Sequence, residues 1–91
     1  MAYHVIIKRN AEKALSKLDA KAQSIVAHWI LDKLEGCANP RLVGDGKALA
    51  GTEGGWRWRV GTYRILGIID DDKVVIEIFK LGHRSIVYRN L

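Results

Sequence analysis

The chain has 91 residues, enough for one domain with a small core, and we expect a single domain over residues 1–91. Its composition is 48% hydrophobic and 27% charged, which excludes a disordered chain. The net charge of +5 is compatible with an acidic partner or a nucleic acid but does not decide between them. The one cysteine, Cys37, excludes an internal disulfide and has no Cys or His at metal-ligand spacing, so we expect no metal and no cofactor. No apolar run approaches the roughly 18 residues of a membrane span, so we expect a cytoplasmic protein without a membrane partner.

The first half of the chain predicts a strand followed by two helices. Residues 3–8 alternate, with Tyr3, Val5 and Ile7 on one side. Apolar residues then recur at helical spacing over residues 10–18 and 19–34, with Asp19 placed to cap the second helix and Gly36 to end it. The short connection predicts an antiparallel helical hairpin. Residues 36–55 are rich in glycine and predict a loop, with a helical turn at residues 47–50.

Residues 56–66 alternate aromatic or aliphatic side chains with arginines and carry a Gly-Thr turn, which predicts a tight β-hairpin. A two-residue loop places Arg59 opposite Arg64 and Trp58 opposite Ile65. One side is then apolar and covers the helical hairpin, and the other side carries Arg57, Arg59 and Arg64. Like charges directly opposed across a ladder cost up to about 1 kcal/mol, so this pattern favours a surface built for a polyanion.

Residues 74–80 predict a further strand after a polar turn. With Ile69 opposite Val74, the rows on the arginine side would be Arg59–Arg64–Phe79 and Arg57–Leu66–Glu77, and Glu77 could pair with Arg57. The predicted fold is α+β in the order β-α-α-β-β-β, an N-terminal helical hairpin packed on an antiparallel sheet.

The arginines are the main candidates for chemistry, because guanidinium groups match phosphate geometry. Arg84 follows the last predicted strand and is expected on the same surface as Arg64, with Tyr88 four residues further on. Three other candidates keep alternative interpretations. Phe79 is a base-stacking platform or a residue covered by the C-terminal tail; His83 is a base, an acid, a phosphate donor or a loop residue; Lys47 contacts a phosphate or is only solvated.

Several of these motifs together resemble one family. The runs Lys47-Ala48-Leu49-Ala50-Gly51, Trp56-Arg57-Trp58-Arg59-Val60-Gly61-Thr62-Tyr63-Arg64, Gly82-His83-Arg84 and Val87-Tyr88 resemble the RelE toxins of bacterial and archaeal toxin–antitoxin systems. The resemblance extends over the whole chain. It implies the RelE-like, microbial-RNase-like fold.

The resemblance also implies an activity: a ribosome-dependent endoribonuclease, or mRNA interferase, which cuts mRNA in the ribosomal A site by attack of a 2′-OH on the adjacent phosphate and so stops translation. By position, Arg64 corresponds to the arginine that stabilises the phosphate, Arg84 to the C-terminal active-site arginine, and Tyr88 to the tyrosine that orients or deprotonates the nucleophile. Arg57 and Arg59 stand where some relatives have lysines. Since a guanidinium group does not accept a proton, the base would be Tyr88, His83 or a ribosomal group.

The implied partners are a cognate antitoxin protein, the ribosome and mRNA, with no direct binding to DNA in the absence of the antitoxin. Two alternatives remain open from the sequence. One is a ParE-like toxin, which shares the fold and inhibits DNA gyrase without nuclease chemistry. The other is a non-catalytic RNA-binding or degenerate toxin that keeps the basic surface and has lost turnover.

Overall fold

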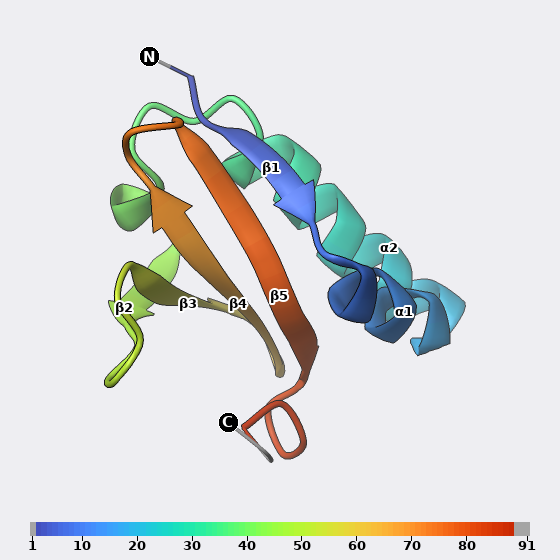
Figure 1. Ribbon diagram of the computed structural model, residues 1–91. Helices are drawn as coiled ribbons and strands as arrows, with labels where there is room; N and C mark the ends of the chain where they lie inside the picture. The colour runs from blue at the N-terminus through green and yellow to red at the C-terminus, as the bar shows by residue number, and fades with distance from the viewer. Residues whose placement is uncertain (1, 89–91) are drawn as a thin grey trace.

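Two helices pack on one face of a five-stranded sheet in the computed structural model, which describes residues 2–88. The sheet order is β1-β5-β4-β3-β2 (Figure 1). The elements in chain order are β1 (His4–Ile7), α1 (Arg9–Lys17), α2 (Ala20–Trp29), the π-helical turn η1 (Ile30–Leu34), the 3-10 turn η2 (Pro40–Leu42), β2 (Asp45–Ala48), β3 (Gly55–Val60), β4 (Tyr63–Asp70) and β5 (Val75–His83). Among the described residues, no helix is long and apolar enough to cross a membrane.

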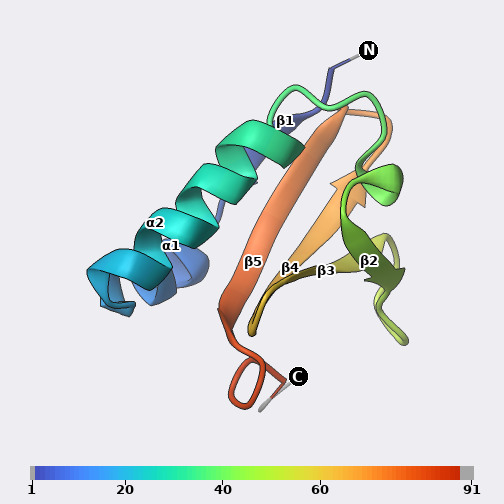
Figure 2. The ribbon, with the colours of Figure 1, turned by 180° about the vertical axis from the view of Figure 1, so that it is seen from behind.

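Both views of the ribbon show the helices beside β1 and β5, with β2 at the far edge of the sheet (Figures 1 and 2). The side chain of Asp19 caps α2 by accepting a hydrogen bond from the Ala22 N–H at 2.8 Å, as predicted. α1 begins at Arg9, with Lys8 rather than the predicted Asn10 at its N-cap, and it has no side-chain cap. The core between the layers is formed by Ala11, Val26, Ile30, Leu34, Trp58, Val60, Ile65, Ile69, Ile76, Ile78 and Leu81.

The predicted α+β class is confirmed, but the sheet is mixed rather than wholly antiparallel. β1 runs parallel to β5, with His4 beside Val75 and Ile7 beside Ile78. Period-two alternation is the same in parallel and antiparallel strands, so it shows which residues face the core but not the direction of the neighbouring strand.

The prediction of a loop with a helical turn at residues 47–50 is wrong, because this segment contains β2. The four residues of β2 are mostly exposed and have no apolar alternation. They are held by antiparallel pairing with β3, in which Lys47 lies beside Arg57. The strand also needs Gly46, since a Cβ there would come within 2.3 Å of Trp56 Nε1.

The β3–β4 hairpin has the predicted register, with Arg59 opposite Arg64 and Trp58 opposite Ile65. The Trp58 side chain is fully buried, and its Nε1–H donates to the carbonyl oxygen of Pro40 at 3.0 Å. A Cβ on Gly67 would lie 3.2 Å from the Trp58 ring, so this glycine leaves the room that the indole occupies. Through its hydrogen bond to Pro40, the Trp58 side chain connects the hairpin to the segment before β2.

The predicted register of β5 is wrong. Ile69 lies opposite Ile76 rather than Val74, and a β-bulge inserts Phe79 between the pairs Gly67–Ile78 and Leu66–Lys80. Arg64 therefore lies opposite Gly82 and not beside Phe79. Glu77 lies opposite Ile68, and its carboxylate pairs with Lys8 at 3.4 Å instead of with Arg57.

Substitution of Trp58 by alanine is expected to lower the free energy of unfolding by about 3–5 kcal/mol, because it removes a fully buried indole and leaves the Pro40 carbonyl without its donor. Urea unfolding followed by circular dichroism measures the loss. Leu42→Ala, at a side chain that is 81% exposed, is the control and should change stability by less than about 0.5 kcal/mol. Equal losses in the two variants would contradict the assigned core.

Candidate functional site

The sheet face opposite the helices carries two rows of residues across four strands. One row is Asp45–Arg59–Arg64–Gly82, and the other is Lys47–Arg57–Leu66–Lys80. We call the basic residues of these rows the cationic face: Lys47, Arg57, Arg59, Arg64 and Lys80. β2 brings Lys47 to this face, which the loop prediction could not show. Lys80 is a basic residue that the sequence interpretation missed, because the predicted register gave its place opposite Leu66 to Glu77.

Arg59 and Arg64 lie opposite each other, but their guanidinium groups bind different partners. Arg59 extends toward β2, where its Nη1 lies 3.5 Å from Asp45 Oδ2. This pair is exposed, so it keeps Arg59 accessible and contributes little to stability. The Asp45 carboxylate nonetheless offsets some of the repulsion that the register creates.

Arg64 is buried although it belongs to the cationic face. It is 5% exposed, and its Nη1 donates to the carbonyl oxygens of Gly61 at 2.9 Å and Tyr63 at 2.8 Å. The guanidinium group therefore stabilises the turn of the β3–β4 hairpin by binding two of its carbonyl oxygens. To contact a phosphate, Arg64 must direct its remaining N–H groups outward from this position.

Arg84 reaches the same hairpin turn from the other end of the chain. Its backbone N–H donates to the Thr62 carbonyl oxygen at 2.8 Å, and its side chain is exposed. The residues after it form a turn in which the N–H groups of Ile86 and Val87 donate to the His83 carbonyl oxygen. In Figures 1 and 2 this C-terminal turn lies next to the end of the hairpin. Tyr88 belongs to it and is 41% exposed.

His83 lies on the other side of the sheet from the cationic face. It pairs with Tyr63, and the two rings meet edge to face with centroids 6.1 Å apart. Its Nδ1 accepts the Ser85 N–H at 3.1 Å and lies 2.8 Å from Ser85 Oγ. An N–H donor requires a lone pair, so the proton of the neutral ring is on Nε2. In this arrangement Nδ1 accepts a hydrogen bond and Nε2–H is the donor of the ring.

Phe79 does not lie beside Arg64, whose partner on β5 is Gly82. It lines a cavity of about 470 Å³ that is also lined by Asn10 and Ala14 of α1, by Lys80, Leu81 and Gly82 of β5, and by Ile86 and Val87 of the C-terminal turn. The sequence interpretation that Phe79 stacks a base beside Arg64 therefore does not fit the structure. The structure brings together Lys47, Arg57, Arg59, Arg64 and Arg84, but not His83 or Phe79.

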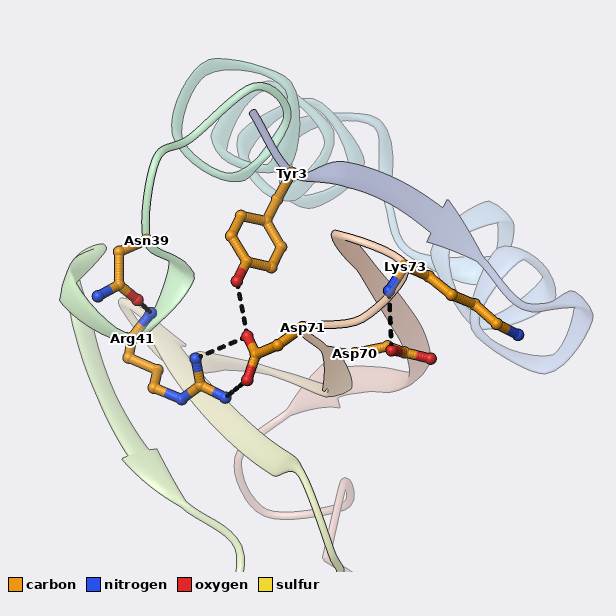
Figure 3. A network of polar contacts seen from close by, with 6 residues as sticks. All are labelled: Tyr3, Asn39, Arg41, Asp70, Asp71 and Lys73. Carbon is orange, nitrogen blue, oxygen red and sulfur yellow. Dashed lines mark hydrogen bonds and ion pairs between the residues drawn. The ribbon is translucent and has the colours of Figure 1, made fainter. Parts of the chain in front are cut away.

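The opposite end of the sheet is acidic and holds a network of three side chains (Figure 3). Arg41 makes a two-pronged contact with Asp71, at 3.1 and 2.9 Å, and the Tyr3 hydroxyl donates to the same carboxylate at 2.6 Å. The bonds from Arg41 and then Tyr3 lower the pKa of Asp71, and the Asp71 carboxylate raises the pKa of Tyr3. Within residues 2–88, no group of three or more His, Cys, Asp or Glu side chains is arranged to hold a metal ion.

A family model described as the ParE toxin of the type II toxin–antitoxin system parDE matches residues 5–88. The chain belongs to the RelE/ParE family of toxins. Toxin RelG of Mycobacterium tuberculosis is 33% identical over 91 residues, which cover 98% of this chain and 99% of RelG. The extent of both matches agrees with the resemblance seen in the sequence.

Solved structures of RelE toxins have the same fold. The toxin–antitoxin complex RelBE2 of M. tuberculosis contains a chain that is 30% identical with a TM-score of 0.77, over 93% of this chain and 94% of that one. The archaeal RelE–RelB complex of Pyrococcus horikoshii gives 30% identity and a TM-score of 0.74, over 96% and 100% of the two chains. Isolated RelE of E. coli, at 20% identity and a TM-score of 0.68, supports the RelE-like fold alone.

Arg64→Ala is expected to lower the free energy of unfolding by about 1.5–3 kcal/mol, because it removes two charge-assisted hydrogen bonds at the hairpin turn. Arg84→Ala makes the same chemical change at an exposed side chain and should cost less than about 0.5 kcal/mol. Urea unfolding of both variants measures the difference. If Arg64→Ala unfolded at the wild-type urea concentration, the buried position of this guanidinium group would be wrong.

Asp71→Asn is expected to make stability less dependent on pH in acid. Because the folded pKa of Asp71 lies below its ordinary 3.8, its stabilisation is complete above that pH and is lost as the pH falls through the lowered folded value. Urea unfolding between about pH 4 and about pH 2 should therefore show a smaller loss in the variant than in the wild type. Glu35, whose pKa is lowered by the Val5 N–H and then by His4, leaves a residual dependence.

Asp72→Asn, at the exposed neighbouring position, is the control for this change of charge. Identical acid profiles for Asp71→Asn and the wild type would show that the Arg41–Asp71–Tyr3 network does not stabilise the folded state.

Proposed function

We propose that this type II toxin is a ribosome-dependent mRNA endonuclease that cuts in the A site. The observation that supports the proposal most is the cationic face, in which basic residues from four strands lie in two adjacent rows. Arg84 adds a further exposed guanidinium group at the hairpin turn. This concentration of donors on a sheet suits an RNA backbone and the charge that develops at a phosphate during cleavage.

The proposed reaction is an internal transfer. The 2′-oxygen forms a bond to phosphorus, the bond from phosphorus to the 5′-oxygen breaks, the 2′-OH loses its proton, and the 5′-oxygen gains one. Arg57 and Arg59 bind and align the RNA backbone. Arg64 contacts the hairpin turn through its guanidinium group and Arg84 through its backbone N–H, and both side chains stabilise the negative charge on the non-bridging oxygens.

Proton transfer places a constraint on the other residues. Guanidinium groups do not accept a proton, and His83 Nδ1 is occupied by the Ser85 N–H. Tyr88, which is 41% exposed and would accept as its phenolate, or a group of the ribosome is therefore the proposed acceptor for the 2′-OH proton. We also propose a cognate antitoxin that covers the cationic face, since the RelE-type chains of M. tuberculosis and P. horikoshii were solved in complexes with antitoxins.

A ParE-like gyrase inhibitor is the second candidate, because the matching family model is described as ParE toxin. The two candidates differ in what a cell accumulates after induction. A nuclease leaves messages that are cut within codons. A gyrase inhibitor leaves messages intact and causes gyrase–DNA cleavage complexes to accumulate.

Inducing the toxin and mapping the 5′ ends of translated messages is the deciding experiment, with a purified ribosome cleavage assay beside it. We expect cuts within codons and a cleavage rate for Arg84→Ala about 10²–10³-fold lower than the wild type, the loss typical of one stabilising donor. Arg9→Ala removes the same charge from the exposed start of α1 and should keep the wild-type rate. Intact messages together with accumulated gyrase–DNA complexes would reject the nuclease in favour of the gyrase inhibitor. Growth arrest with neither cut messages nor gyrase–DNA complexes would also reject the nuclease proposal.

A further inference from the structure

The β-bulge in β5 decides which of its residues reach the cationic face. Ile76 and Ile78 are buried on the helix side, so uninterrupted alternation would put Lys80 in the core and Leu81 on the opposite face. The extra residue, Phe79, reverses this order. Leu81 then lies opposite Ile65 in the core and is 4% exposed, while Lys80 lies opposite Leu66 on the cationic face.

We propose that Lys80 is a further phosphate-binding residue of this toxin, one that positions the RNA backbone at the β5 end of the row Lys47–Arg57–Leu66–Lys80. The proposal rests on the nuclease function above. Lys80 is assigned to binding and positioning, because an ammonium group gives three donors without a fixed direction and suits an anion as a point charge.

The geometry of the row supports this assignment. Its ends are separated by three strand spacings, about 14 Å, with basic side chains on β2, β3 and β5. The fourth member, Leu66, is fully buried, so its apolar side chain fills the position between Arg57 and Lys80 and leaves no water-exposed group there. Cations beside a surface of low dielectric constant attract an anion more strongly than the same cations in open water.

The charges near Lys80 define the limit of the surface. Glu77, on the same strand and the same face, has its carboxylate 3.4 Å from Lys8 on the β1 side. Beyond it, Ile6 and Ile68 flank Glu77 on β1 and β4. The row Lys47–Arg57–Leu66–Lys80 therefore ends at Lys80. An RNA backbone that crosses the sheet from β2 along this row leaves the basic surface at this residue.

Binding of a fluorescent single-stranded oligoribonucleotide over a range of salt concentrations tests the proposal. Lys80→Gln should reduce the slope of log Kobs against log salt by about 0.7, the value for one phosphate of a single strand that is no longer neutralised. It should also slow cleavage on programmed ribosomes by roughly tenfold, about 1.4 kcal/mol. Lys80→Arg keeps the charge and should restore most of the slope. Lys73→Gln removes the same charge at the exposed turn before β5, the opposite end of that strand, and is the matched control.

The outcomes separate this inference from the proposed function. If Lys80→Gln and Lys73→Gln gave the same salt slope while the wild type cleaved mRNA, Lys80 would not bind phosphate and the nuclease proposal would stand. If Lys80→Arg lost as much binding as Lys80→Gln and both melted early, the role of Lys80 would be structural, which overturns the inference. A wild-type protein that neither binds the oligoribonucleotide nor cuts mRNA on ribosomes would overturn both proposals.

Discussion

The register of β3 against β4 is the constraint on which the rest of this structure depends. It buries Trp58 against the helices and at the same step directs Arg57 and Arg59 to the opposite face. A slip of one residue would exchange the two faces and expose the indole. The hydrogen bond from Trp58 to Pro40 extends this constraint to the segment that leads into β2. Packing on one side of the hairpin thus fixes the positions of the charges on the other side.

The same register opposes two arginines, and the fold accommodates them without removing either charge. Arg59 lies beside Asp45, so one guanidinium group is drawn toward the sheet edge. Arg64 binds the carbonyl oxygens of the hairpin turn, so the other is withdrawn to the end of the strands. Arg64 therefore has a structural role in addition to any role in binding. Loss of activity after its substitution must be separated from loss of the hairpin turn.

Much of the fold follows from periodicity in the sequence, and the errors have definite physical origins. The hairpin and the helices were predictable because burial of large apolar side chains imposes their spacing. β2 was not, since its residues are polar or small and its pairing with β3 supplies the information. The parallel direction of β1 was also invisible to a period-two pattern. The bulge was missed because the predicted strand ended at Lys80, so the change of phase between Ile78 and Leu81, both of which are buried, was not considered.

These limits apply to the candidate site as well. The arginines were found because they sit in the strongly alternating hairpin. Lys80 was missed, and the predicted place of Phe79 beside Arg64 is wrong, because the side of each residue depends on the position of one inserted residue. Alternation alone does not locate a bulge, so the faces of the residues that follow one are fixed by their pairing with the neighbouring strand.

The contrast between the two ends of the sheet gives the molecule a charge asymmetry along its strands. Basic side chains gather near the hairpin turn, and Asp70, Asp71 and Asp72 lie at the other end of β4. This asymmetry gives the protein an electric dipole. The field of a polyanion exerts a torque on that dipole before any contact forms. Encounters would begin with the basic end foremost. This orientation would weaken as ionic strength shortens the Debye length to about 8 Å under physiological conditions.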